Sequence, residues 1–146
     1  MNRKFMTQED KELFLKDICA RLPFGVKAKI TEEGVLSYDS GIGVIVGKEH
    51  IDNEIFILQC KNDGWCLTAI SEFVPYLRPM SSMTEEEYGI FLNTQSWECG
   101  ARSHPKYEYT YKTFDWLNEH HFDYHGLISM GLTLEAPEDM YDKNSK

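Results

Sequence analysis

The feature that most constrains the fold of this chain is a series of short β-rich runs between Val26 and Glu72. Gly, Asn and Asp separate the runs, and Asn62-Asp63-Gly64 gives the strongest turn signal because these residues tolerate a positive φ. The pattern predicts antiparallel strands in a meander. Five strands of this length favour a small closed barrel of the Src-homology-3 type or a curved sheet, and they cover residues 26–30, 35–38, 42–46, 54–58 and 65–70.

Helical patterns lie on both sides of the β-rich region. Residues 7–22 combine an acidic first turn with apolar residues three and four apart, and Pro and Gly follow them. Thr84 and Glu87 form a capping-box pattern, which predicts a helix over residues 84–94. A third helix is expected over residues 113–121, where aromatic and apolar residues again share one face.

Three connecting segments have weaker patterns. Residues 74–79 contain two prolines and are expected to form an extended connector that ends the sheet. Residues 95–109 resemble an irregular loop, and a loop of that length in a compact domain is often functional. Residues 126–131 are expected to form one helical turn.

Together these elements predict one α+β domain. It would contain an N-terminal helix, a five-stranded antiparallel small barrel or curved sheet, and two to three C-terminal helices packed against it. A chain of 146 residues has the usual size of one domain, and 42% hydrophobic residues are enough for a core. Residues 23–79 would form the β-rich part, residues 80–137 the helical part and residues 138–146 a frayed tail.

The formal charge of −9 is unevenly distributed. Residues 1–80 carry ten Lys or Arg against twelve Asp or Glu, whereas residues 81–146 carry five against twelve. A protein that binds a phosphate backbone needs clustered basic side chains, and this chain has no such cluster. Net charge therefore disfavours nucleic-acid binding, and the acidic excess favours solubility or a basic partner.

Cysteine usage and hydropathy indicate the cellular compartment of the protein. The first 20 residues lack the apolar stretch of an export signal, and no apolar run approaches the ~18 residues that span a bilayer. We therefore expect a cytoplasmic protein without a membrane segment, in which the thiols are reduced. Zinc is the alternative, but ligand spacing is lacking among the four cysteines, which are Cys19, Cys60, Cys66 and Cys99.

Two segments of the C-terminal half carry a family resemblance. Residues 77–87 read LRPMSSMTEEE and residues 114–128 read FDWLNEHHFDYHGLI, with GLTLEAP following at residues 131–137. The chain resembles a group of uncharacterised proteins of gut Bacteroidales and of their phages and mobile elements. The resemblance covers the C-terminal half and the connector. It implies a bacterial or phage cytoplasmic setting, and it transfers no catalytic residue because the group has no assigned activity.

A histidine-rich cluster is the strongest metal candidate. If the third helix continued far enough, His121 and His125 would lie four residues apart on one face, as metal-binding helices require. Asp123 and His120 would add further ligands, giving a metal-dependent hydrolase. Against this, Gly126 favours a helix end before it, and capping or packing roles explain the histidines as well.

Other catalytic patterns are incomplete. Cys99 and His104 could form a nucleophile and base, but no third residue to orient the base is identifiable. Gly43 and Gly47-Lys48 lack the spacing of a phosphate-binding loop and fit hairpin turns better. The sequence therefore leans against an enzyme and gives no catalytic residue or cofactor.

Aromatic residues are dense in the C-terminal half. Tyr and Trp dominate the residues that carry binding energy at protein interfaces. We therefore predict a non-enzymatic binding or interaction module, an accessory protein of a phage or mobile element, with a surface over residues 95–111 and 116–124. The metal-dependent hydrolase and a small nucleic-acid binder that uses the barrel remain alternatives. The candidate ligand- or partner-binding residues are Trp97, Tyr107, Tyr109, Tyr111, Trp116, His120 and Tyr124.

Overall fold

A computed structural model describes residues 6–30, 41–51, 54–61, 64–69, 73–99 and 105–141. The helices are α1 (Gln8–Arg21), α2 (Glu85–Thr94) and α3 (Tyr111–Glu119), with single-turn 3-10 helices η1 (Leu22–Phe24) and η4 (Met80–Ser82). The strands are β1 (Lys27–Ile30), β2 (Gly41–Ile51), β3 (Glu54–Lys61), β4 (Gly64–Ala69), β5 (Phe73–Pro79), β6 (Ser96–Cys99), β7 (Pro105–Glu108), β8 (Phe122–Asp123) and β9 (Leu134–Glu135). The predicted α+β class is confirmed.

The main sheet has the strand order β4-β3-β2-β1-β5-β8, with β9 also paired to β5. Strands β1 to β5 pair antiparallel, whereas β8 and β9 run parallel to β5. The sheet formed by the described strands is therefore mixed and open, not the closed antiparallel barrel that was one expectation. The physical reason is that C-terminal segments pair with β5, so β5 does not close the sheet onto β4. The strand expected at residues 35–38 lies outside the described residues.

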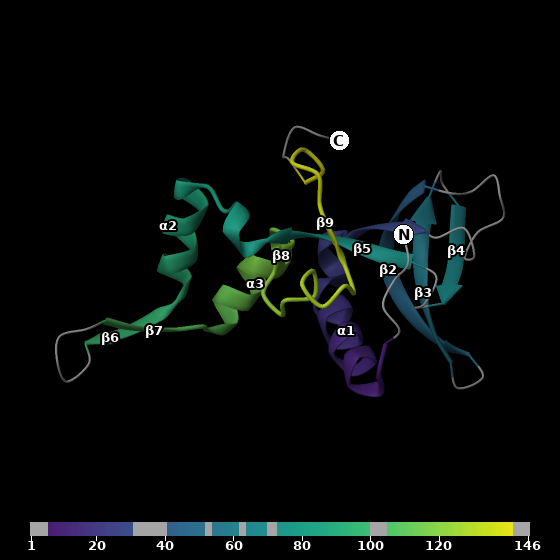
Figure 1. Cartoon of the computed structure of the whole chain (residues 1–146), viewed down its shortest axis with the longest axis horizontal. Coiled ribbons are helices and arrows are strands. Elements are labelled where there is room, and N and C mark those ends of the chain that lie inside the picture. Colours follow the sequence, from purple (N-terminus) through teal and green to yellow (C-terminus); the bar gives the residue numbers. More distant parts are fainter. Residues whose placement is uncertain are drawn as a thin grey trace.

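Strand β5 replaces the expected connector. Its residues pair with β1, with Ala28 opposite Pro75, and four of its seven residues are buried. Proline fixes φ at a value that an extended strand can adopt. Two prolines in this short run nevertheless suggested a break in the sheet. The extended backbone instead forms a strand that reaches from the sheet to the helical part of the molecule (Figure 1).

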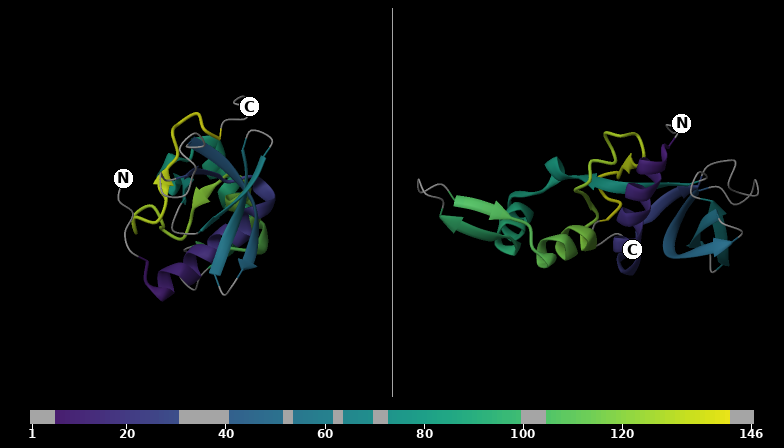
Figure 2. Two further views of the ribbon diagram at one scale, coloured as in Figure 1. Left: turned by 90° about the vertical axis from the view of Figure 1, so that its right-hand side faces the viewer. Right: turned by 90° about the horizontal axis from the view of Figure 1, so that it is seen from below.

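The expected loop at residues 95–109 contains a hairpin. Strands β6 and β7 pair antiparallel, with Trp97 opposite Tyr107. Figure 1 and the right-hand view of Figure 2 place this hairpin at one end of an elongated molecule, with β2, β3 and β4 near the other end. The irregular-loop prediction was wrong because cross-strand pairing of such short strands has little local signal.

The third helix begins and ends earlier than expected. Thr110 caps it, and its hydroxyl accepts a hydrogen bond from the Thr113 backbone N–H. The helix ends at Glu119, and His121 has a left-handed φ of 64°. Residues 121–125 therefore do not continue the helix, and the i, i+4 spacing of the proposed metal residues has no helical basis. The expected helical turn at residues 126–131 is a hydrogen-bonded turn, in which the Met130 N–H donates to the Gly126 carbonyl.

Two apolar clusters hold these elements together. The larger one packs α1 against the sheet, with Phe14 and Phe73 rings 5.8 Å apart. The smaller one contains Phe91, Leu117 and Phe122 and joins α2, α3 and β8. Across the described residues, no helix combines the length and apolarity needed to cross a membrane.

Candidate interaction surface

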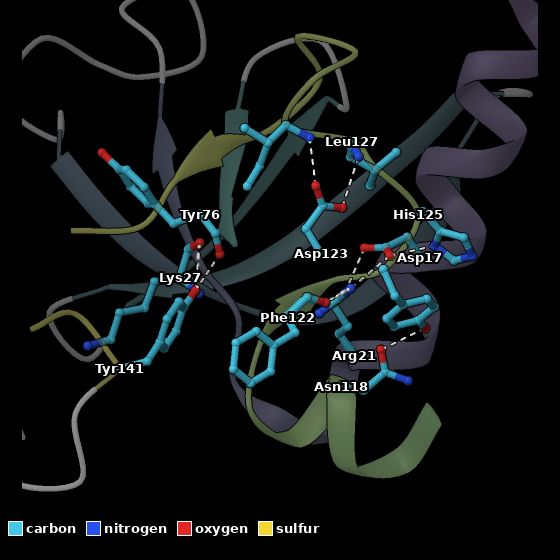
Figure 3. Close-up of polar contacts among 12 residues, drawn as sticks. Asp17, Arg21, Lys27, Tyr76, Asn118, Phe122, Asp123, His125, Leu127 and Tyr141 are labelled. Atoms are coloured by element: carbon cyan, nitrogen blue, oxygen red, sulfur yellow. Dashed lines mark hydrogen bonds and ion pairs between the residues drawn. The ribbon is translucent and has the colours of Figure 1, made fainter. Parts of the chain in front are cut away.

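A buried ion pair anchors the C-terminal segment to α1 (Figure 3). Asp17 and Arg21 are fully buried, with Arg21 Nε 2.7 Å from Asp17 Oδ2. Arg21 also donates to the Phe122 carbonyl at 2.6 Å, and its guanidinium lies 5.0 Å from the ring centre of Tyr124. His125 Nδ1 lies 2.8 Å from Asp17 Oδ1. One buried carboxylate thus connects α1 to residues that follow α3.

The charge of Asp17 is stabilised by this arrangement. Burial alone raises the pKa of a carboxyl group, but hydrogen bonds from His125 and Arg21 and the positive charge of Arg21 outweigh it. The net result is an Asp17 pKa below its usual 3.8. The carboxylate is therefore ionised at neutral pH and balances the buried guanidinium. This chemistry is structural, because each partner in the network fixes a neighbouring element.

The residues of the predicted metal cluster have separate partners. His125 contacts Asp17, while the Asp123 carboxylate accepts the backbone N–H groups of Leu127 and Ile128, both at 2.9 Å. His121 is buried and stacks on Tyr141, with ring centres 3.7 Å apart. Within the described ranges, no three His, Cys, Asp or Glu side chains are grouped so that they could hold a metal ion.

The Tyr141 ring fixes the segment that follows β9. Its hydroxyl accepts a hydrogen bond from the Lys27 N–H at 2.8 Å and donates to the Tyr76 carbonyl at 2.8 Å (Figure 3). Burial lowers the pKa of the neighbouring His121 from 6.5 to about 3, and the positive charge of Arg21 acts in the same direction. His121 is therefore neutral at physiological pH. Within the expected frayed tail at residues 138–146, Tyr141 is held by these bonds and the Met140 carbonyl accepts a hydrogen bond from Lys27 Nζ at 2.9 Å.

Aromatic rings connect α2, α3 and Tyr109, the residue that follows the β6–β7 hairpin. We call α2, the hairpin and α3 together the aromatic arm (residues 85–99 and 105–119). Phe91 of α2 packs edge-on against Tyr109 at 5.6 Å and stacks on Trp116 at 6.1 Å. Tyr109 in turn contacts Phe114 edge-on at 5.5 Å, and Phe114 contacts Tyr124 at 5.4 Å. Edge-to-face contacts of this kind fix ring orientation beyond what burial alone provides.

Much of this aromatic surface remains exposed. Tyr111 is 73% exposed, and Phe114 is 41% exposed although it packs against two other rings. Among the residues whose side chains the structure describes, which exclude those of residues 48–72 and 97–106, the strongly exposed large apolar side chains are Tyr88, Ile90, Tyr107, Tyr109, Tyr111 and Phe114 of the arm and Val46 of β2. Concentration of exposed apolar groups in one part of a molecule is typical of an interaction site.

The structure places the predicted site residues in two settings. Tyr107, Tyr109 and Tyr111 are exposed on the arm, as an interaction surface requires. Trp116 and Tyr124 are only partly exposed, and Tyr124 donates its hydroxyl hydrogen to Asn118 Oδ1 at 2.8 Å. For Trp97 the structure describes the backbone pairing in β6 alone.

Sequence reasoning missed three exposed members of the arm. Tyr88 and Ile90 lie on α2, and Phe114, which was expected to share one face of the helix with Leu117, lies on α3. The buried face of α3 is instead marked by Thr113 and Leu117, which are four residues apart and fully buried. Asn118 is buried as well, and helical spacing places Phe114 between Leu117 and Asn118. The exposure of Phe114 therefore could not be read from the spacing of the sequence.

A groove lies beside the arm. It has a volume of about 780 Å³ and separates the start of α2 and the end of α3 from the segment after β9. Trp116 and His120 of the predicted site lie in its wall, with their rings stacked 4.6 Å apart. Its other lining residues are Arg78, Pro79, Ser82, Thr84, Glu86, Glu87, Ile90, Glu135, Ala136, Pro137, Glu138, Asp139 and Tyr141. We call it the acidic groove.

Comparison of the chain with protein-family models, with curated proteins and with solved structures found no significant match.

Proposed function

We propose that this chain is a non-enzymatic interaction module that binds a partner protein through the aromatic arm. The observation that carries the proposal is the pair formed by Tyr109 and Phe114. Each ring is more than 40% exposed, yet the two are held edge-on with centres 5.5 Å apart. Ordered aromatic rings that remain accessible lose little conformational entropy when a partner covers them.

The support beneath these rings favours the same proposal. Phe91 is buried and contacts both Tyr109 and Trp116, so the exposed rings rest on a packed layer. The hydroxyl of Thr110 donates to the Thr94 carbonyl at 2.8 Å, which ties the start of α3 to the end of α2. A rigid support reduces the cost of binding, because fewer groups must become ordered in the complex.

The alternatives gain less support. A metal-dependent hydrolase needs ligands that converge, and the described histidines and carboxylates have separate partners. A nucleic-acid binder that uses the β-rich part would need clustered basic side chains, and the formal charge of the chain is −9. We further propose that the module acts in a bacterial or phage cytoplasm as an accessory protein of a phage or mobile element, on the resemblance of residues 77–87 and 114–128.

Affinity capture with purified variants tests the interaction surface. Tagged wild-type protein, the double variant Tyr109→Ser/Phe114→Ser and the control Val46→Thr are incubated with lysate of cells that naturally contain the protein. Val46 is also exposed but lies on β2, outside the arm. We expect wild type and control to retain the same partner and the double variant to lose it by about tenfold, as removal of interface aromatic residues does.

Circular dichroism melts of all three proteins establish that each variant is folded. A folded double variant that captures the same partner in the same amount as the wild type would refute the proposal.

A further inference from the structure

The lining of the acidic groove is strongly unbalanced in charge. It contains five carboxylates and a single guanidinium, a formal charge of −4 with His120 neutral. That guanidinium, on Arg78, is already paired: its two terminal nitrogens lie 2.9 and 2.7 Å from the Glu87 carboxylate oxygens. The pair lowers the pKa of Glu87, because the bonds from Arg78 and Thr84 outweigh the effect of burial. The groove is therefore left with an excess of negative charge.

Three of the remaining carboxylates are available to a ligand. Glu86, Glu135 and Glu138 are exposed, and within the described part of the chain they contact no cationic group. They come from separate elements, with Glu86 on α2 and the other two on the segment from β9 onward. Negative charge contributed by both elements favours a cation in the groove.

The aromatic part of the wall adds a second feature that fits a cation. His120 Nδ1 lies 2.9 Å from the Trp116 carbonyl, and a carbonyl only accepts hydrogen bonds, so Nδ1 carries the hydrogen. In the neutral ring, Nε2 is then an acceptor that can receive an N–H group from a ligand.

We propose that the acidic groove binds lysine or arginine side chains of a basic, extended segment of the partner protein. This inference rests on the proposed function and names the chemistry of the partner. A volume of about 780 Å³ lies within the ~300–1,000 Å³ typical of ligand sites, which is enough for a short peptide segment. Ile90 lines the groove and is also one of the exposed apolar residues of the arm, so one partner can cover both surfaces.

The structure favours an organic cation over a metal ion. Metal binding needs several oxygen or nitrogen ligands within about 2–2.6 Å of one point. In the described residues, the carboxylates of the groove do not form such a group. Guanidinium and ammonium groups on flexible side chains can instead reach separate carboxylates along the groove.

Fluorescence anisotropy with the full chain tests this inference without the natural partner. The probe is a fluorescent peptide, Gly-Arg-Gly-Lys-Gly-Arg-Gly, and its matched control has citrulline and acetyl-lysine in place of Arg and Lys. We expect the charged peptide to bind, the neutral peptide to bind at least about tenfold more weakly, and affinity to fall as salt is raised. Equal binding of the two peptides would contradict the inference.

Charge variants separate the groove from the overall charge of the protein. The variant Glu135→Gln/Glu138→Gln removes two groove carboxylates, and the control Glu9→Gln/Glu12→Gln removes two exposed carboxylates from α1. We expect the groove variant to bind the charged peptide about tenfold more weakly and the control to change affinity by less than about twofold. Equal losses in both variants would show attraction by net charge alone and would overturn the groove assignment.

Two further measurements separate the possible failures. The variant Tyr109→Ser/Phe114→Ser should keep the peptide affinity, because neither residue lines the groove, and loss of peptide binding there would contradict the assignment. If peptide binding depends on the groove but the arm variant captures the natural partner normally, the proposed function fails while the groove remains a cation site. Spermine is the second probe. If spermine binds the wild type but not Glu135→Gln/Glu138→Gln, and the charged peptide does not bind, the ligand of the groove is a free polyamine and not a peptide.

Discussion

His125 and Asp17 are 108 residues apart in the sequence, and His125 Nδ1 lies 2.8 Å from Asp17 Oδ1. The same carboxylate is bound by Arg21, whose guanidinium also holds the Phe122 carbonyl. Through these contacts the first helix fixes the chain where it leaves α3. The aromatic arm therefore extends from a base that is held by buried charges.

We predict that Asp17→Asn destabilises the protein strongly. The substitution leaves the fully buried Arg21 without its counter-charge, and breaking a buried ion pair in this way costs about 3–5 kcal/mol. Urea unfolding at pH 7 measures the effect, with Glu12→Gln on the same helix as an exposed control that should change stability by less than about 0.5 kcal/mol. A loss below about 1 kcal/mol for Asp17→Asn would show that the network does not hold the fold together.

A second prediction concerns the pH dependence of stability. The pKa of His121 is lowered from 6.5 to about 3 in the folded protein, first by burial and then by the charge of Arg21. Between these values the unfolded chain binds a proton that the folded chain does not, so stability is complete above about pH 6.5 and decreases as pH falls. We expect the free energy of unfolding to fall by about 2 kcal/mol between pH 6.5 and pH 5 from this group alone.

The variant His121→Asn isolates this contribution. Asn has no titratable group and tolerates the left-handed backbone found at this position. Urea unfolding at pH 5, 5.75 and 6.5 should therefore show a flatter pH dependence for the variant than for the wild type. Identical slopes for the two proteins would mean that His121 is protonated in the folded state as readily as in the unfolded chain.

The two faces of α3 should respond differently to truncation. Leu117 is fully buried between α2, α3 and β8, so Leu117→Ala should cost about 2–5 kcal/mol. Phe114 is 41% exposed, and Phe114→Ala should cost less than about 1.5 kcal/mol, the value of its ring contacts. Thermal and urea unfolding compare the variants. A cost for Phe114→Ala that matches Leu117→Ala would place this ring in the core and remove it from the interaction surface.

Features with local causes were predictable from the sequence. The helix over residues 7–22 is observed as Gln8–Arg21 with Thr7 as its cap, and the box of Thr84 and Glu87 begins α2 as predicted. Capping depends on residues three apart in the sequence, so the signal and its result lie in the same segment. The same holds for the pairing of β3 with β4, in which Lys61 lies opposite Gly64.

Features that depend on distant residues were not predictable. Strands β8 and β9 have two residues each, and they exist because they pair with β5, more than 40 residues earlier in the chain. The partner of Arg21 at Phe122 likewise leaves no local pattern. The density of aromatic residues predicted an aromatic surface in the C-terminal half. Which of these rings are exposed and which are buried depends on how α3 packs against α2, and that packing has no local signal in the sequence.

The most direct test of the central claim is site-specific photo-cross-linking from the aromatic arm. A benzophenone amino acid replaces Tyr111, which is 73% exposed, or, as a control, Val46 on β2, and the proteins are irradiated in lysate with the natural partner. The account predicts a defined cross-linked product from position 111 that is absent from position 46 and is lost when Tyr109→Ser/Phe114→Ser is added. The same products from both positions, or a product at 111 that survives the added substitutions, would contradict it.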